Sequence, residues 1–193
     1  PFNFDTGERE IYNNSAFFLA GLIIEKVSGK SYADFVKERI FDKVGMKDSH
    51  YCSESTIIKG KVKGFDMGPK GLQKAGFLRH TYPYAAGSLC SSAGDLLAWN
   101  RALHGGKVLP AASYQEMITP QSLNDGTKLR YGLGITMHDV NGHRVIEHGG
   151  GINGFLSASD YFPDEDAVIV VLSNSTGLPP DPVVAAIADR VFG

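Results

Sequence analysis

A histidine followed by three glycines, His148-Gly149-Gly150-Gly151, is the stretch of this sequence whose residue types are best suited to chemistry. It lies within Val145–Leu156, between apolar segments that are typical of strands. Glycines lack side chains, so a ligand can lie against the backbone and bind its N–H groups. The stretch therefore predicts one wall of a catalytic or binding site. A glycine-rich hairpin turn with a surface histidine is the alternative interpretation.

A pair of polar side chains, Tyr12 and Asn14, lies at the start of the first helical segment and is the second candidate for chemistry. A tyrosine becomes a useful base only where nearby cations stabilise its phenolate. An asparagine amide can both donate and accept hydrogen bonds, so it can orient such a neighbour. The pair therefore indicates a proton-transfer group with an orienting partner. A turn with a helix N-cap explains the same residues without any chemistry.

Composition excludes several classes of protein. The 193 residues are 42% hydrophobic and 21% charged, which is typical of a globular protein. The net charge of −2, with both signs interspersed, argues against a nucleic-acid-binding surface, and no segment approaches the roughly 18 apolar residues of a membrane span. Cys52 and Cys90 are interpreted as buried thiols, rather than as a disulfide or metal ligands. The histidines show no H-E-x-x-H spacing, so neither a zinc hydrolase nor any cofactor is expected.

Helical periodicity dominates the first part of the chain. A helix is predicted from Asn14 or Ser15 to Gly29, and further helices between Ser31 and Gly45, from Ser92 to Gly105, and over residues 114–118. Loops and small strands are expected over residues 47–81. The first helix should bury an apolar face made of Phe18, Leu19, Leu22, Ile23 and Val27.

Beyond Asn124 the apolar period changes from about 3.6 to about 2, which indicates strands. Four strands are predicted in an antiparallel meander, with a last helix over residues 182–192 covering one face. The predicted fold class is therefore α+β. Residues 1–124 would form a mainly helical region carrying Y-x-N, and residues 125–193 the sheet, the C-terminal helix and H-x-G. The strands are expected at residues 131–138, 144–147, 155–162 and 167–172.

Six motifs in order resemble the serine β-lactamase and penicillin-binding protein family, in its branch of class C β-lactamases, DD-peptidases and esterases. The resemblance covers nearly the whole chain and implies a β-lactamase/transpeptidase-like fold that is incomplete here. The motifs are Tyr12-Asn-Asn14, Gly29-Lys-Ser-Tyr32, Phe41-Asp-Lys-Val-Gly-Met46, Ala86-Gly-Ser-Leu-Cys-Ser-Ser92, Tyr131-Gly-Leu-Gly134 and His148-Gly-Gly150.

This resemblance implies a role for each candidate residue. Tyr12 resembles the catalytic tyrosine that shares proton transfer with a lysine, and Asn14 the asparagine that holds that lysine and the substrate. His148 matches the first position of the K-T-G-like motif, whose cation stabilises the tyrosine and binds the anionic end of the substrate. Gly149 and Gly150 continue that substrate-binding strand, and Gly151 would offer one N–H of the oxyanion hole.

The sequence departs from the family pattern at the nucleophile. No serine is followed three residues later by lysine, and Thr56-Ile-Ile-Lys59 has the wrong hydroxyl in the wrong region. The sequence also begins at Pro1, with neither an initiator methionine nor a signal peptide. We therefore expect the C-terminal portion of a larger hydrolase, inactive alone. Its expected partners are the missing N-terminal segment, or a second copy paired through an open sheet edge.

A second departure concerns the substrate. His148 stands where class C β-lactamases usually carry lysine, and Gly149 where threonine is common. A histidine is a weaker and pH-dependent cation, so the resemblance favours peptidase or esterase action on a small amide or ester over efficient β-lactam hydrolysis. A non-catalytic binding or scaffold module that keeps the family cleft is the alternative. The resemblance implies a periplasmic or secreted location, and a cytoplasmic one stays open.

Overall fold

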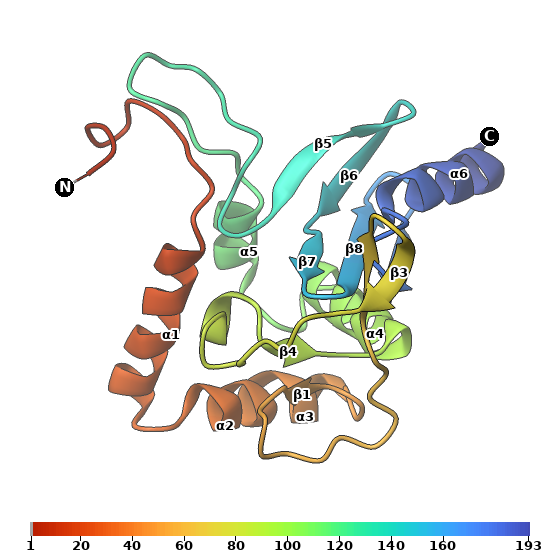
Figure 1. Ribbon diagram of the computed structural model, residues 1–193. Helices are drawn as coiled ribbons and strands as arrows, with labels where there is room; N and C mark the ends of the chain where they lie inside the picture. Colours follow the sequence, from red (N-terminus) through yellow and green to blue (C-terminus); the bar gives the residue numbers. More distant parts are fainter. Residues whose placement is uncertain (1) are drawn as a thin grey trace.

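A five-stranded antiparallel sheet forms the C-terminal part of the computed structural model, which describes residues 2–193 and leaves Pro1 outside (Figure 1). Both β6 and β7 pair with β8, and β9 pairs along the opposite edge of β8. β5 extends the sheet beyond β6 but does not reach β7. The strands are β5 (Thr136–Val140), β6 (His143–Glu147), β7 (Gly150–Ile152), β8 (Phe155–Phe162) and β9 (Ala167–Ser173).

Helices cover both faces of this sheet. Alternate residues of β8 point to opposite faces, so Ala158 and Phe162 face α6 (Asp181–Phe192) and Ser159 faces α4 (Ala93–His104). The α6 side holds an apolar core that also contains Val145, Ile169, Val184 and Ala188. On the α4 side, Asn100 donates a hydrogen bond to the hydroxyl of Ser159 over 2.7 Å. The predicted α+β class, with the C-terminal helix on an antiparallel sheet, is confirmed.

The predicted strand boundaries are only partly correct. The glycine run was expected to separate two strands, but Gly150–Ile152 is itself a strand, β7, and the turn follows at Asn153–Gly154. The first strand is shorter than residues 131–138, because the chain from Tyr131 to Ile135 forms a tight turn with a single bridge between Tyr131 and Thr136.

Two helices of the first part, α1 (Asn14–Ser28) and α4, have the limits that the sequence predicts. α1 begins with the Asn13 side chain accepting a hydrogen bond from Ser15 N and ends at Gly29, whose φ of 70° suits glycine. The helix predicted between Ser31 and Gly45 is instead divided by a π-helical turn. It comprises α2 (Tyr32–Val36), η1 (Lys37–Phe41) and α3 (Asp42–Val44). The short helix predicted over residues 114–118 begins earlier than expected, as α5 (Ala111–Met117). A 3₁₀ turn, η2 (Tyr84–Ala86), lies between these helices in the sequence.

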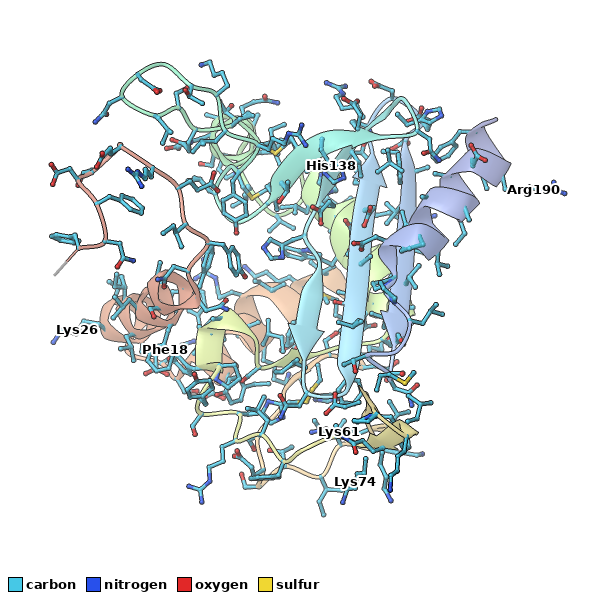
Figure 2. The ribbon with its side chains drawn as sticks, turned by 45° about the horizontal axis from the view of Figure 1, so that its top comes forward. Phe18, Lys26, Lys61, Lys74, His138 and Arg190 are labelled. Atoms are coloured by element: carbon cyan, nitrogen blue, oxygen red, sulfur yellow. A yellow bond between two sulfur atoms is a disulfide. The ribbon has the colours of Figure 1, made fainter. Side chains whose placement is uncertain are left out.

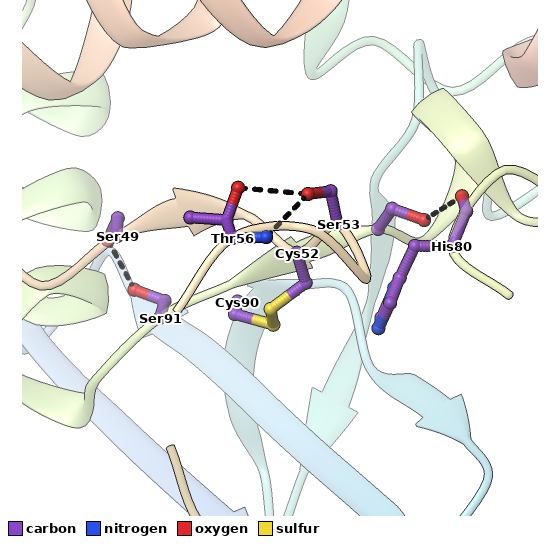
Figure 3. Close-up of a disulfide and its surroundings, with 8 residues drawn as sticks. Ser49, Cys52, Ser53, Thr56, His80, Cys90 and Ser91 are labelled. Atoms are coloured by element: carbon purple, nitrogen blue, oxygen red, sulfur yellow. Dashed lines mark hydrogen bonds between the residues drawn. A yellow bond between two sulfur atoms is a disulfide. The ribbon is translucent and has the colours of Figure 1, made fainter. Parts of the chain in front are cut away.

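The prediction that the two cysteines are buried thiols is wrong, because they form a disulfide (Figure 3). β1 (His50–Tyr51) pairs with β4 (Leu89–Cys90), and Cys52 N donates to Ser88 O over 2.8 Å. This pairing sets the Cα atoms of Cys52 and Cys90 5.7 Å apart, within the usual disulfide range. No sequence pattern predicts that pairing across the intervening loop, where β2 (Phe65–Gly68) and β3 (Gly71–Lys74) form a hairpin.

The prediction that α1 buries an apolar face is also wrong, because most of that face is exposed within residues 2–193. Leu22, Ile23 and Val27 are 44%, 61% and 82% exposed, and Leu19 is 57% exposed. Gly21 is the buried residue of this helix, because a glycine lets Tyr84 and Ala85 of η2 approach closely. Phe18 packs beside it, with its ring centroid 4.9 Å from that of Tyr84, while Lys26 points away from the protein (Figure 2).

The contact at Gly21 predicts a difference between two glycine substitutions in helices. A Cβ at Gly21 would lie 2.4 Å from Ala85 Cβ, whereas one at Gly94 would meet nothing nearer than Ser92 Oγ at 4.0 Å. Overpacking costs about 1–3 kcal/mol, and replacing a helical glycine by alanine gains up to about 1 kcal/mol. Urea unfolding should therefore show Gly21→Ala losing about 1–2 kcal/mol and Gly94→Ala losing nothing. Equal stabilities for the two variants would contradict the packing described for α1.

Candidate active site

The structure brings together the polar side chains that the sequence singled out. Tyr12 lies on the extended segment before α1, and its ring centroid is 6.0 Å from that of His148, which follows β6. The Tyr12 hydroxyl donates a hydrogen bond to Asn14 Oδ1 over 3.1 Å. Segments far apart in the sequence therefore meet at one place, while the catalytic roles of these residues stay predictions.

His148 lies at a break in the pairing of the sheet. β6 and β7 pair with β8 in one continuous register, since Glu147 pairs with Asp160 and Gly150 with Ser157. Between these pairs, His148 and Gly149 make no ladder pair with β8. The two strands thus act as a single strand whose pairing with β8 is interrupted at His148 and Gly149.

At Gly150, β7 lies close to a side chain of β8. A Cβ at Gly150 would lie only 2.5 Å from Ser157 Oγ. The backbone here therefore lies bare beside the site, as the glycine run predicts.

One N–H of this strand points away from the sheet. Hydrogen-bonded and non-hydrogen-bonded pairs alternate along an antiparallel ladder, and a two-residue turn closes on a hydrogen-bonded pair. Here that pair is Ile152 with Phe155, so Gly151 and Leu156 form the non-hydrogen-bonded pair that follows. Because β5 does not extend beside β7, the Gly151 N–H is directed at an uncovered edge.

Tyr131, for which the sequence predicts no role, completes an aromatic cluster with Tyr12 and His148. Its ring centroid lies 6.2 Å from that of Tyr12 and 6.0 Å from that of His148. Its hydroxyl lies 3.2 Å from His148 Nε2, and His148 Nδ1 lies 2.6 Å from the Gly149 carbonyl oxygen. The Tyr131-Gly-Leu-Gly134 motif gave the position of this tyrosine, but nothing in the sequence indicated its contact with His148.

All six predicted site residues line one hollow of about 2500 Å³. Small-molecule pockets in proteins usually measure about 300–1,000 Å³, so this hollow exceeds what one small ligand would fill. Its walls include apolar side chains of α1, of the disulfide-linked strands, of α4 and of β8, among them Phe18, Leu89, Trp99 and Phe155.

Behind the hollow, on the α6 face of the sheet, lies a group of acidic side chains. Asp160 is 6% exposed, and its Oδ1 makes no hydrogen bond within the described chain. Loss of solvation, followed by the negative charges of Glu147 and Asp181, raises the pKa of Asp160 to about 7. His138, labelled in Figure 2, has its Nδ1 3.8 Å from Glu147 Oε1. An ionisable group therefore lies one strand away from His148.

Two kinds of feature are absent from residues 2–193. No three histidine, cysteine, aspartate or glutamate side chains come together there in a way that could hold a metal ion. None of the helices described combines the length and the apolar character needed to span a membrane.

A family model described as Beta-lactamase matches residues 1–193. A D-aminopeptidase from Brucella anthropi is 27% identical over 178 residues, which are 91% of this chain and 33% of that protein. A D-stereospecific amidohydrolase from Streptomyces sp. superposes with a TM-score of 0.84 at 26% identity, covering 99% of this chain and 57% of that one. A D-amino acid amidase from Ochrobactrum anthropi SV3, solved with L-phenylalanine amide, gives a TM-score of 0.80 at 25% identity over 95% of this chain and 56% of that one.

The matched proteins are longer than this chain. The chain spans about a third of the length of the curated D-aminopeptidase that it matches, and somewhat more than half of the two solved structures. The predicted resemblance to the β-lactamase and penicillin-binding protein family is confirmed.

The environment of Asp160 predicts a pH dependence of stability. The pKa of this carboxyl is about 7 in the folded protein and about 4 in the unfolded chain. At pH values between these two, the carboxyl is protonated in the folded protein but not in the unfolded chain. The free energy of unfolding should therefore fall as pH rises from about 4 to about 7, by on the order of 2–4 kcal/mol from this group. Asp160→Asn should remove that part of the decrease.

Urea unfolding at a series of pH values measures this effect. The matched control is Asp164→Asn, because the Asp164 side chain is 58% exposed at the surface. The control should keep the wild-type pH dependence. A wild-type slope that persists in Asp160→Asn would contradict the environment described for this carboxyl.

Proposed function

Because this chain belongs to the Beta-lactamase family, we propose that it forms the tyrosine- and histidine-bearing part of an acyl hydrolase that cleaves an amide or ester through an acyl-enzyme. One observation carries the proposal: Tyr12, Asn14 and His148 meet beside the uncovered glycine edge of β7. An acyl-transfer site needs a proton-transfer group and oxyanion donors close together, and this arrangement supplies both kinds of group.

In the proposed reaction a serine hydroxyl adds to the carbonyl carbon of the substrate, and the unprotonated member of a pair formed by Tyr12 and a lysine takes up its proton. The carbonyl oxygen gains negative charge, which the Gly151 N–H is oriented to stabilise. The C–N or C–O bond then breaks, and the leaving amine or alcohol takes up the proton. Water finally hydrolyses the acyl-serine ester. Asn14 Oδ1 accepts a hydrogen bond from the Tyr12 hydroxyl and so orients that group.

We propose that the serine and its lysine come from residues outside this sequence. Three observations support this: the sequence contains no S-x-x-K, the hollow is far larger than a small ligand, and the matched proteins are longer. A segment carrying the nucleophile could fill the hollow and bury apolar side chains on its walls, which would stabilise the complex by about 25 cal/mol per Å² of apolar surface.

An amide or short peptide of a D-amino acid is the proposed substrate class. The names of the similar proteins, a D-aminopeptidase, a D-stereospecific amidohydrolase and a D-amino acid amidase, support it. A histidine where class C β-lactamases usually carry lysine further favours peptidase or esterase action over efficient β-lactam hydrolysis.

The first prediction from this proposal concerns the isolated 193-residue chain. Positioning groups without a nucleophile cannot form an acyl-enzyme, so the chain incubated with a labelled penicillin should show no covalent adduct by mass spectrometry. A stoichiometric adduct on any serine of this chain would show that the nucleophile has been misplaced.

The second prediction concerns the reconstituted enzyme. The chain mixed with a separately produced segment carrying S-x-x-K should hydrolyse a D-amino acid amide, and Tyr12→Phe should lower kcat/KM by about 10²–10⁴, the range of one general acid–base group. Tyr114→Phe is the matched control, because Tyr114 contacts His104 outside the hollow. A complex that forms and binds the amide without cleaving it would instead favour a binding or scaffold module.

A further inference from the structure

Both ring nitrogens of His148 are occupied by protein partners. Nδ1 lies 2.6 Å from the carbonyl oxygen of Gly149, and Nε2 lies 3.2 Å from the hydroxyl of Tyr131. A carbonyl oxygen can only accept a hydrogen bond, so Nδ1 must carry the proton. In the neutral imidazole Nε2 is then the acceptor, and the Tyr131 hydroxyl donates to it.

The Tyr131 hydroxyl is suited to this donor role. Tyr131 is half-buried. Loss of solvation, followed by interactions with Tyr12, Glu10 and Glu147, raises the pKa of Tyr131 above its ordinary value. The hydroxyl therefore keeps its proton at neutral pH and remains a donor.

The backbone around Tyr131 is held in place, which fixes where its side chain can reach. The Tyr131 carbonyl accepts from Gln121 N over 3.1 Å, and Leu133 N donates to Met117 O over 3.0 Å. Gly132 N donates to Ile135 O over 2.8 Å and closes the tight turn. Gly132 itself leaves no room for a side chain, since a Cβ there would lie 2.2 Å from Met117 O. This turn is therefore a firm support for a residue that orients another.

The consequence for a ligand is that neutral His148 has no free N–H. A substrate carboxylate requires donors, and binding one through this imidazole would require breaking the contact of Nε2 with Tyr131 or of Nδ1 with Gly149. An uncharged amide or ester end carries no negative charge, so it can bind without breaking either contact of the imidazole. The contacts of the histidine therefore discriminate between two kinds of substrate end.

We propose that Tyr131 is a positioning residue for His148 and a determinant of specificity, which holds the neutral imidazole as its Nδ1–H tautomer and disfavours substrates that end in a carboxylate. The part on specificity rests on the proposed acyl hydrolase function. The part on the tautomer does not, because it concerns the chain without any substrate.

Nitrogen NMR of the chain labelled with ¹⁵N-histidine tests the tautomer at about pH 8.5, where an ordinary imidazole is neutral. His148→Gln identifies the His148 signals by their loss. Wild-type His148 should show the proton on Nδ1, and Tyr131→Phe should shift the population towards the Nε2–H form, because Nε2 has lost its donor. A proton on Nε2 in the wild type, or an unchanged population in the variant, overturns the proposal.

Tyr114→Phe is the matched control for this experiment. The Tyr114 hydroxyl lies 2.7 Å from His104 Nδ1, so the variant removes a tyrosine–histidine contact of the same kind elsewhere. It should alter the His104 signals and leave those of His148 unchanged. A change at His148 in this control would show that the Tyr131→Phe result is not specific, and would overturn the assignment.

Kinetics of the reconstituted enzyme test the specificity. Two substrates with the same acyl group, one ending in an amide and one in a carboxylate, give a ratio of kcat/KM values. Tyr131→Phe should shift this ratio about fivefold towards the carboxylate, the size expected for one hydrogen bond. An unchanged ratio overturns the role in specificity. A reconstituted enzyme that cleaves neither substrate would refute the proposed function, and the tautomer measurement would still decide whether Tyr131 positions His148.

Discussion

The release of strand pairing at His148 and Gly149 is the constraint on which the candidate site depends. On either side of these two residues the chain pairs with β8 in one register, so the sheet fixes where the unpaired stretch lies. Regular pairing through this stretch would hold the backbone of His148 against β8. Within the unpaired stretch the imidazole of His148 contacts the Tyr131 hydroxyl and the Gly149 carbonyl, and it lies beside Tyr12.

Local signals predicted much of the fold, and tertiary contacts account for what they missed. The helical period and Gly29 predicted the limits of α1, and the change of period after Asn124 predicted the sheet. The buried side of α1 could not be read from its apolar residues, because close approach at Gly21 decides it. The disulfide escaped prediction for a similar reason, since it depends on the pairing of β1 with β4, which neither strand's sequence indicates.

The sequence predicted three residues of the candidate site but not the contact between His148 and Tyr131. Tyr12, Asn14 and His148 came from a motif order that resembles a known family, and the fold brings them to one hollow. The partner of His148 could not be predicted in this way. Tyr131 reaches the histidine because hydrogen bonds to Gln121 and Met117 hold its turn against the end of α5, and such contacts leave no periodic trace in a sequence.

A crystal structure of a complex between this chain, a segment carrying S-x-x-K and a boronic acid would test the central claim most directly. The boronate imitates the tetrahedral intermediate, so its oxygens mark where the charge of the reaction develops. We expect one boronate oxygen within about 2.7–3.1 Å of Gly151 N, the usual reach of an oxyanion-hole donor, and another beside the Tyr12 hydroxyl. A boronate bound away from β7, with Tyr12 and His148 making no contact to it, would contradict the account.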